Sequence, residues 1–241
     1  MKVRSIYSPN FNEKRRSYKS IKFLIIHYTG MQSERESIIR LCNSKSKVSS
    51  HFVINQKGKI YRLVQDNQIA WHAGKSCWGK YKNLNKTSIG IELVNKGHKF
   101  GYTNFKKKQL SSLIKICKNL IRKYRIKKQN IVGHSVVAPL RKIDPGEKFP
   151  WEYLAKKKIG IWHDYKPKFL KQFRKNKIFK KLDKEKFFNN LNNIGYCISV
   201  KKKFFQTKTL KAFQRHYRKE LINGSIDKEC FLIAENLTKK L

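Results

Sequence analysis

Apolar and polar residues follow two different periods along this chain, and the two periods alternate. Short apolar runs that end at a turn or a polar residue predict strands over 22–27, 49–54, 59–64, 88–94 and 131–132. Apolar positions at helical spacing predict a helix over 33–42, where Ser33 and Glu36 have the capping-box spacing. A longer helix is predicted over 110–124 and a short one over 151–154. This order of elements is that of an α/β fold.

Two side chains with metal-binding groups follow the last of these strands. In the stretch IVGHSVVAPLRKIDPG, Gly133 breaks the apolar start just before His134. Asp144 precedes Pro145-Gly146, a pair that fixes a turn, and Pro139 opposes a helix between the two ligands. We therefore expect His134 and Asp144 on a stiff loop at a strand end. Taken alone, such a loop is more often plain polar surface than a metal site.

A third candidate ligand ends an earlier strand. The apolar run Phe23–Ile26 stops at His27, and Thr29-Gly30 then breaks the strand. A catalytic zinc ion takes three protein ligands, favours nitrogen and carboxylate oxygen, and keeps one position open. His27, His134 and Asp144 make such a set. The sequence does not tell whether the two strands that end in histidine are neighbours.

The motifs around these residues resemble those of a known enzyme family. HYT, SSHFVI, AWHAG, SIGIELVN, GHSVVAP and KIDPG follow one another in the family order between residues 5 and 154. In these motifs the chain resembles the type-2 N-acetylmuramoyl-L-alanine amidases, which are zinc amidases related in fold to peptidoglycan-recognition proteins. The resemblance implies a mixed central β-sheet flanked by helices. It also implies that Zn²⁺ binds at the three ligands above and that Glu92 and Lys142 serve the catalytic chemistry.

Glu92 also stands out on physical grounds. It interrupts the apolar run SIGIELV, and a carboxylate inside a buried strand is costly unless it is paired or takes part in chemistry. We therefore expect Glu92 to act as the general base, and Lys142 to stabilise the oxyanion that forms in the reaction. His51 is the main rival for the metal. It opens a strand, and the matching histidine of the family binds no zinc, so we expect it in the core or behind a ligand.

The AWHAG segment predicts part of a substrate-binding wall. Its small residues let a backbone approach a ligand closely, while Trp71 and His72 shape the surface. A turn with a packed tryptophan is the alternative. In the family this block borders the substrate groove, so Trp71, His72, Ala73 and Gly74 are expected to bind substrate. Trp78, in the next loop, is a weaker candidate for the same contact.

The composition shifts near residue 166 to lysine, phenylalanine and asparagine, which indicates a linker and a second module. We expect a catalytic domain over 1–165 and a small domain over 166–241. The order of a helix, Gly195-Tyr196, the segment TLKAFQRHY, Asn223-Gly224 and a last helix loosely resembles the small three-helix peptidoglycan-binding domain. A basic helical tail without a ligand is the alternative.

The charge of the chain bears on its partners. Lys and Arg number 57 against 15 Asp and Glu, which gives a formal net charge of +42. Clustered lysines favour nucleic acid as a partner, but here lysine is abundant everywhere rather than in one stripe. That distribution is typical of a lysine-rich proteome. A partner with many carboxylates also fits the charge. We therefore expect peptidoglycan or muropeptides as partners, rather than nucleic acid.

The cysteines and the N-terminus bear on the compartment. Five cysteines are scattered without CxxC spacing, at positions 42, 77, 117, 197 and 230. Their odd number and their contexts predict free, mostly buried thiols in a reducing compartment. Residues 1–20 are charged and lack the apolar core of a signal peptide, and the longest apolar run is too short for a membrane span. We expect a cytoplasmic monomer, with a periplasmic location left open.

The expected function is zinc-dependent hydrolysis of the amide bond between N-acetylmuramic acid and L-alanine, in cell-wall turnover or recycling. Two other classes stay open. A non-catalytic peptidoglycan-binding protein shares the fold, although such proteins commonly lack the full ligand set. A basic nucleic-acid-binding protein would hold no metal. The sequence does not separate a recycled anhydro-muropeptide from the intact wall as the substrate.

Overall fold

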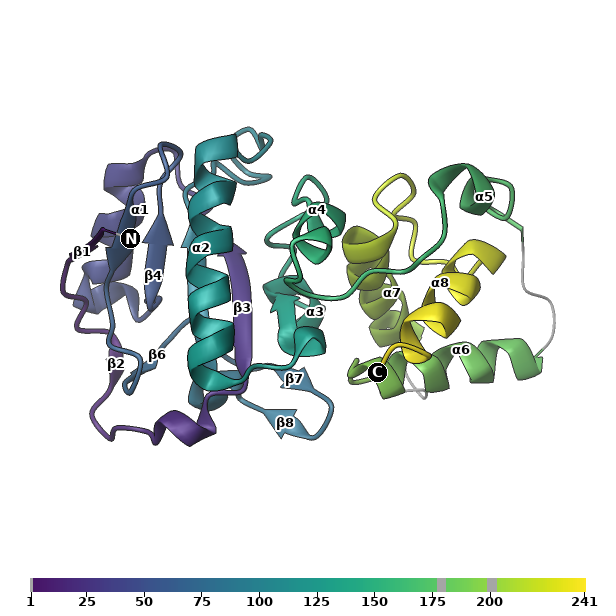
Figure 1. The fold of residues 1–241 in the computed structure, drawn as a ribbon, viewed down its shortest axis with the longest axis horizontal. Helices are drawn as coiled ribbons and strands as arrows, with labels where there is room; N and C mark the ends of the chain where they lie inside the picture. The colour runs from purple at the N-terminus through teal and green to yellow at the C-terminus, as the bar shows by residue number, and fades with distance from the viewer. Residues whose placement is uncertain (1, 177–180, 199–202) are drawn as a thin grey trace.

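The central element of the fold is a six-stranded mixed β-sheet (Figure 1). The computed structural model describes residues 2–176, 181–198 and 203–241. The strand order is β1-β5-β4-β9-β3-β10, and in this order the strands span Val3–Ser5, Ile60–Arg62, Phe52–Ile54, Ser88–Leu93, Phe23–Tyr28 and Ile131–Gly133. Strands β4 and β5 are antiparallel and form the predicted hairpin, while the other neighbouring strands are parallel.

α-Helices, four short 3₁₀ helices and two small strand pairs also occur in the described part of the chain. The helices are α1 (Glu34–Cys42), α2 (Lys107–Tyr124), α3 (His134–Val137), α4 (Trp151–Lys156), α5 (Pro167–Lys171), α6 (Lys181–Ile194), α7 (Lys203–Tyr217) and α8 (Lys228–Thr238). The antiparallel pairs are β2 (Phe11–Asn12) with β6 (Ile69–Ala70), and β7 (Cys77–Trp78) with β8 (Tyr81–Lys82). The predicted mixed sheet flanked by helices is confirmed.

The start of α1 follows the capping pattern in the sequence. The Ser33 hydroxyl accepts a hydrogen bond from the Glu36 backbone N–H at 3.1 Å. The Glu36 carboxylate in turn accepts from the backbone N–H of Gln32 at 3.3 Å. These contacts satisfy backbone donors that have no partner inside the helix, which is why the helix begins here.

The segment between His134 and Asp144 differs from the expected loop. Its first four residues form one helical turn, α3, which starts at His134 itself. Pro139 follows two residues after the turn ends, so the helix stops where the proline predicts. The remaining residues lead to Asp144, whose peptide bond to Pro145 is cis.

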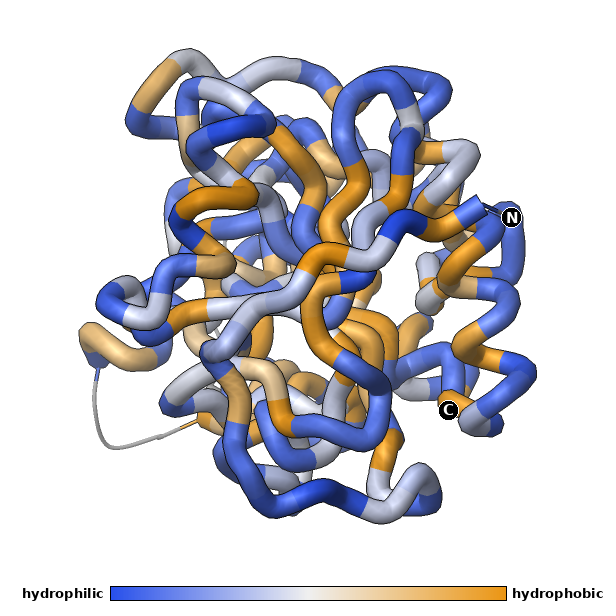
Figure 2. The backbone as a smooth tube through the Cα atoms, turned by 90° about the vertical axis from the view of Figure 1, so that its left-hand side faces the viewer, coloured by the Kyte–Doolittle hydropathy of each residue, from blue (hydrophilic) through white to orange (hydrophobic). Residues whose placement is uncertain are grey.

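One face of the sheet is covered by α2 (Figure 1). Leu113, Cys117 and Leu120 on this helix belong to the same buried cluster as Leu24 and Ile91 on the central strands. Hydrophobic residues are concentrated toward the centre of the molecule, and hydrophilic residues occupy most of the outer turns (Figure 2). The lysine-rich residues of α2 lie on its solvent side, so much of the positive charge is ordinary helix surface.

The opposite side of the core continues into the C-terminal helices. Ile25 on β3 and Val136 on α3 belong to one buried cluster with Phe187 on α6, Phe213 on α7 and Ile233 on α8. These helices stand beside the sheet, on the side of β10 (Figure 1). The predicted C-terminal helices are therefore present, and they share a core with the sheet.

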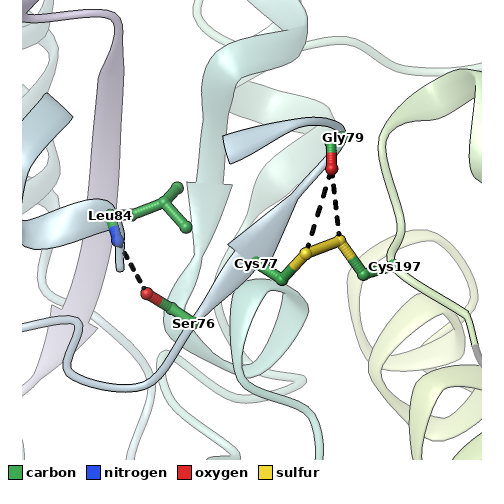
Figure 3. The surroundings of a disulfide bond; sticks show 5 residues. All are labelled: Ser76, Cys77, Gly79, Leu84 and Cys197. Carbon is green, nitrogen blue, oxygen red and sulfur yellow. Dashed lines mark hydrogen bonds between the residues drawn. A yellow bond between two sulfur atoms is a disulfide. The ribbon is translucent and has the colours of Figure 1, made fainter. Parts of the chain in front are cut away.

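A disulfide bond links the two regions of the chain (Figure 3). Cys77 on β7 is joined to Cys197, with a Cα–Cα distance of 6.0 Å. The prediction of five free thiols is wrong for this pair, because a partner 120 residues away leaves no spacing signal in the sequence. Cys42, Cys117 and Cys230 are free. Cysteine usage therefore no longer argues for a reducing compartment.

The chain around the disulfide packs closely. Trp78 packs against Tyr196 at a tilt, with ring centroids 5.0 Å apart, and the Gly79 N–H donates to the Gly195 carbonyl at 2.6 Å. Gly195 has φ of +127° and lies so close to Trp78 that an added Cβ would be 2.4 Å from the indole ring. Only glycine fits this backbone and this contact.

None of the helices in the described residues is long and apolar enough to cross a membrane.

Candidate active site

Parallel pairing brings the carboxyl ends of three strands to one edge of the sheet. Strand β3 lies between β9 and β10. In this register His27 is the partner of Glu92, and Gly133 is the partner of Ile26. His134 follows Gly133 directly, so it starts α3 beside His27. The two strands that end in histidine are therefore neighbours, which the sequence left open.

The three predicted ligands converge at this edge. His27 Nδ1 lies 3.0 Å from His134 Nδ1 and 3.0 Å from Asp144 Oδ2, and the third side of the triangle measures 3.1 Å. All three residues are buried. In a tetrahedron of ligands about 2.0–2.1 Å from zinc, neighbouring ligand atoms lie about 3.3 Å apart. The observed triangle is close to one face of such a tetrahedron, so the residues fit a zinc ion.

The contact made by Nε2 of His134 determines which tautomer its ring adopts. His134 Nε2 lies 3.2 Å from the carbonyl oxygen of Ala73. Because a carbonyl oxygen only accepts hydrogen bonds, the neutral ring carries its proton on Nε2. The His134 Nδ1 therefore offers a lone pair to the triangle.

A chain of three hydrogen bonds fixes the protonation of His27 in the same way. The Ser88 hydroxyl donates to the Leu84 carbonyl at 2.5 Å, so its oxygen accepts from His72 Nε2 at 3.1 Å. His72 Nδ1 is then free to accept from His27 Nε2 at 3.1 Å. This leaves a lone pair on His27 Nδ1. Partners of this kind commonly orient histidines that bind metal.

A glycine on the neighbouring strand makes room for His72. A Cβ added to Gly90 on β9 would lie 2.5 Å from Cγ of the His72 ring. The imidazole therefore packs directly against the strand backbone, where any side chain at position 90 would displace it. This close approach places His72 behind His27.

The charges of the cluster suit metal binding. Burial and the neighbouring His134 lower the pKa of His27 to about 4. Burial alone would raise the pKa of Asp144, but His134 and His27 beside it hold that pKa well below the usual range of a carboxylic acid. Near neutral pH the site thus holds a neutral His27 and an ionised Asp144. Metal ligands must be unprotonated, and both residues meet that requirement.

Glu92 and Lys142 line the same cavity as the three ligands. Burial raises the pKa of Glu92 to about 8; the negative charge of Asp144 adds to this shift and the ammonium group of Lys142 opposes it. Glu92 Oε2 is buried and has no hydrogen-bond partner among the described residues. This oxygen is available to accept a proton from a molecule in the cavity.

The cavity has a volume of about 270 Å³ and basic side chains in its wall. Arg40, Arg141 and Lys142 line it together with the acidic Glu92 and Asp144. Apart from Asp144, which belongs to the ligand triangle, the charged side chains of the wall are three cations and Glu92. Such a wall favours a substrate that carries carboxylates.

The predicted substrate-binding residues divide into two groups. Trp71 and His72 line the cavity, whereas Ala73 and Gly74 are not part of its lining. The Asn85 side-chain oxygen accepts from the backbone N–H groups of His72, Ala73 and Gly74, at 3.2, 2.6 and 3.3 Å. The AWHAG backbone is thus shaped by Asn85, and Ala73 contributes through the carbonyl that contacts His134.

Sequence reasoning missed Asn85 and Arg141. Arg141 donates to the carbonyl oxygens of Ala73 and Lys75 and lines the cavity. It is one of 57 Lys and Arg residues, so its type carried no signal. Asn85 lies in a short 3₁₀ helix, Leu84–Thr87, in a segment whose composition indicates only a loop. For Arg141, the one available hint in the sequence was that it directly precedes Lys142.

Two weaker expectations have clear outcomes. His51 lies away from the ligand triangle and is fully buried, and its Nδ1 accepts from the Gly90 N–H at 3.0 Å. Its ring packs against that of His72, with centroids 5.5 Å apart, which fits the expected place in the core. Trp78 does not line the cavity and instead packs against Tyr196.

Comparison with known proteins matches this geometry to one family. Residues 17–147 match the family described as N-acetylmuramoyl-L-alanine amidase. The chain is 37% identical over 240 residues to the N-acetylmuramoyl-L-alanine amidase AmiD of Escherichia coli, an alignment that covers 93% of this chain and 84% of AmiD.

Two solved structures share the fold over nearly the whole chain. One is the complex of Escherichia coli AmiD with the substrate anhydro-N-acetylmuramic acid-L-Ala-D-γ-Glu-L-Lys, with a TM-score of 0.80, 34% identity and coverage of 95% of this chain and 93% of that one. The other is AmpDh3 from Pseudomonas aeruginosa, with a TM-score of 0.80, 30% identity and coverage of 95% and 96%. The sequence and the fold together show that this chain belongs to the N-acetylmuramoyl-L-alanine amidase family.

Proposed function

We propose that this chain is a zinc-dependent hydrolase that cleaves the amide bond between N-acetylmuramic acid and L-alanine in peptidoglycan or its muropeptide fragments. The observation that carries the proposal is the convergence of three unprotonated ligand atoms at 3.0–3.1 Å from one another. Three lone pairs at this distance repel one another unless a cation or a proton lies between them. Two imidazole nitrogens and one carboxylate oxygen form a set that zinc accepts in catalytic sites.

His27, His134 and Asp144 would hold the ion. When bound, the ion would polarise a water molecule and the scissile carbonyl group. His72 and the Ala73 carbonyl would keep the two imidazole rings in the orientation that directs Nδ1 to the metal.

Glu92 is the proposed general base. Its Oε2 would take the proton of the attacking water as the C–O bond forms, and would then pass it to the leaving nitrogen of L-alanine as the C–N bond breaks. The raised pKa supports this role, because a group whose pKa lies near the operating pH can both take up and release a proton.

Lys142 is the proposed stabiliser of the oxyanion. Its charge already acts on this site, since it opposes the rise in the pKa of Glu92 and lowers the pKa of His27. A cation held beside the carbonyl carbon would favour the transition state over the substrate, because negative charge on the oxygen develops only as water attacks.

The substrate class follows from the relatives and from the cavity wall. AmiD was solved with an anhydro-muramyl peptide as its substrate, and relatives from other bacteria are named 1,6-anhydro-N-acetylmuramyl-L-alanine amidase AmpD. In this chain Arg40 and Arg141 line the cavity and would meet the carboxylates of a stem peptide. Muropeptides with an anhydro sugar end are therefore the first substrates to test.

Residues 166–241 are proposed as a small helical domain of the peptidoglycan-binding type. Its loop before α8 is closed by the Gln214 amide, which donates to the Ser225 carbonyl at 2.9 Å and accepts from the Gly224 N–H at 2.8 Å. Phe187 and Phe213 support the domain from inside. A wall-binding role fits the place of this region beside the active-site sheet.

The proposal is tested by zinc content and by the products formed from defined muropeptides. The purified protein should hold about one zinc ion per chain and release intact stem peptide, identified by mass. His134→Ala should lose both the metal and the activity. His98→Ala, a change at a histidine outside the triangle, serves as the control for zinc content. Normal zinc in the His134 variant would reject the assignment, and substrate binding without products would favour a non-catalytic peptidoglycan-binding protein.

A further inference from the structure

A second cavity, of about 280 Å³, lies between the end of α7 and the segment that follows the metal loop. Arg215, His216 and Tyr217 contribute to its lining from the end of α7, Arg218 contributes from the residue after the helix, and Trp151 and Trp162 contribute from preceding segments. We call it the seam cavity. It shares no lining residue with the cavity at the metal ligands.

Unpartnered polar atoms are concentrated around the seam cavity. Twelve buried side-chain N or O atoms of the described residues have no hydrogen-bond partner, and six of them belong to residues of this lining. All six are nitrogens, on His163, Arg215, His216 and Arg218. His216 is 5% exposed and lacks a partner at both ring nitrogens, and Arg218 is 1% exposed. Buried polar groups are nearly always paired, so this cluster calls for an absent partner.

The unpartnered nitrogens specify an acceptor. Guanidinium groups only donate, so the Nε atoms of Arg215 and Arg218 require oxygen or another acceptor. Arg218 already bonds to Asp227 through Nη1, whereas the carboxylate nearest to Arg215 Nε is that of Glu147, at 3.8 Å. That distance is too long for a hydrogen bond. Arg215 is therefore a partly buried cation in a loose ion pair with Glu147, and its Nε can still donate to a closer carboxylate.

Acidic and aromatic groups set the rest of the ligand's chemistry. Glu147 and Glu220 also line the cavity. Glu220 forms a loose ion pair with Arg174, at 3.8 Å, and its side chain is 49% exposed, so an ammonium group can reach it. Trp151 stacks on the His216 ring at 4.0 Å, and His216 stacks on Tyr217 at 4.1 Å. Aromatic faces give a rigid apolar wall, and opposite charges at its rim fix the orientation of a ligand.

We propose that the seam cavity is a second binding site, for a small peptide that carries both a carboxylate and an ammonium group. The carboxylate is received by Arg215 and the ammonium group by Glu220. A stem peptide with a diamino acid has this chemistry, and its identity as the ligand rests on the proposed function. Water could fill a cavity of this size as well, and the experiment separates the two occupants.

The tryptophans of the chain provide local reporters for this test. Trp151 and Trp162 line the seam cavity, Trp71 lines the metal cavity, and Trp78 packs at the disulfide. The full-length zinc-loaded protein, labelled with 5-fluorotryptophan, should give four ¹⁹F signals, each assigned by a Trp→Phe change. The probe is L-Ala-D-γ-Glu-L-Lys, which has no bond to N-acetylmuramic acid and so is not consumed.

Titration with this peptide should shift the Trp151 and Trp162 signals to saturation and leave Trp78 unchanged. Arg215→Gln should raise the concentration needed for the shift by about tenfold or more, because a charge-assisted contact is lost. Lys208→Gln removes the same charge from the same helix outside the cavity and should have no such effect. Amidating the peptide's C-terminus, or acetylating its amines, should weaken the shift in the unaltered protein.

If the Trp151 and Trp162 signals stay unchanged while the Trp71 signal shifts, the peptide does not bind in the seam cavity, water occupies it, and the proposal is overturned. Equal shifts with the free and the amidated, acetylated peptide would overturn it too. Failure of this inference is distinct from failure of the proposed function. Normal muropeptide cleavage with silent seam signals rejects only the second site, and seam binding without cleavage rejects only the amidase chemistry.

Discussion

His27 and Glu92 are register partners on the neighbouring parallel strands β3 and β9. The proposed ligand and the proposed base thus stand side by side on the two longest strands of the sheet, and backbone hydrogen bonds set their spacing. Positions on strands are held more precisely than positions on loops, which suits a proton transfer that depends on tenths of an ångström.

Changing Glu92 to Gln should separate chemistry from metal binding. The variant keeps the shape of the side chain but cannot take a proton from water. Zinc content should stay at about one per chain, and kcat should fall by on the order of 10²–10⁴, the usual contribution of a positioned acid-base group. Steady-state kinetics and metal analysis of the same sample check both. Glu185→Gln, at an exposed glutamate, is the matched control. Loss of zinc would make Glu92 a ligand, and near-normal turnover would make it structural.

Changing His72 to Ala should weaken zinc binding without removing a ligand. His27 Nε2 would lose its acceptor, so the ring would be free to turn. Affinity for zinc, measured by competition with a chelator, should fall by about 10–100-fold, and excess zinc should restore most of the activity. His72→Asn should recover part of the affinity, because its side-chain oxygen can accept the same proton. Unchanged affinity in the Ala variant would show that His72 does not orient His27.

Removing the disulfide should lower thermal stability. The bond closes a loop with a sequence separation of 120, for which chain entropy predicts about 5 kcal/mol. For a chain of 241 residues this corresponds to a fall in Tm of about 10 °C. Calorimetry of Cys77→Ser, with Cys42→Ser as the control, measures the effect. A reductant should lower the Tm of the unaltered protein and leave that of the Cys77 variant in place. Five titratable thiols in the folded, unreduced protein would contradict the pairing.

Stability should fall in mild acid. Burial lowers the pKa of His51 and of His216 to about 3, and it lowers the pKa of His72 well below its usual value. In the unfolded chain these groups take up protons near pH 6.5, whereas in the folded chain they stay neutral. The free energy of unfolding should therefore decrease as the pH falls from 6.5 toward 3, by about 1.4 kcal/mol per pH unit for each such histidine.

Urea unfolding at pH 7, 6 and 5 measures this slope. His216→Phe keeps an aromatic ring between Trp151 and Tyr217 and should reduce the slope by the share of one histidine. A free energy of unfolding that does not change between pH 7 and pH 5 would show that these rings gain protons in the folded state.

The proposed site residues could be predicted from the sequence because they lie at the ends of apolar runs or interrupt one. His27 and His134 each follow an apolar strand, and Glu92 interrupts one, so chain position alone marked them. Their adjacency depended on strand order, which no local pattern contains. Five of the six strands of the sheet and helices α1 and α2 were predictable for the same reason, whereas the edge strand β1 was not predicted, because it lies in a polar segment without an apolar run.

Residues that act through backbone groups were out of reach. Asn85 shapes the AWHAG segment by accepting hydrogen bonds from three backbone N–H groups, and Ala73 contacts His134 through its backbone carbonyl. The type of side chain at these two positions therefore gives no indication of the role. The Cys77–Cys197 pair was hidden by its long separation. The seam cavity brings residues 147–167 against the end of α7, a contact that only the folded chain reveals.

The buried cluster that joins the sheet to the C-terminal helices has a consequence for cooperativity. Val132 on β10 and Val136 on α3 are covered by the same apolar residues that hold α6 and α7 together. The helices cannot leave without exposing one side of the strand that leads to His134. The chain should therefore unfold in a single transition, and the metal site should be lost when the helices melt. A protease that cuts the C-terminal helices would in this way inactivate a centre that it never reaches.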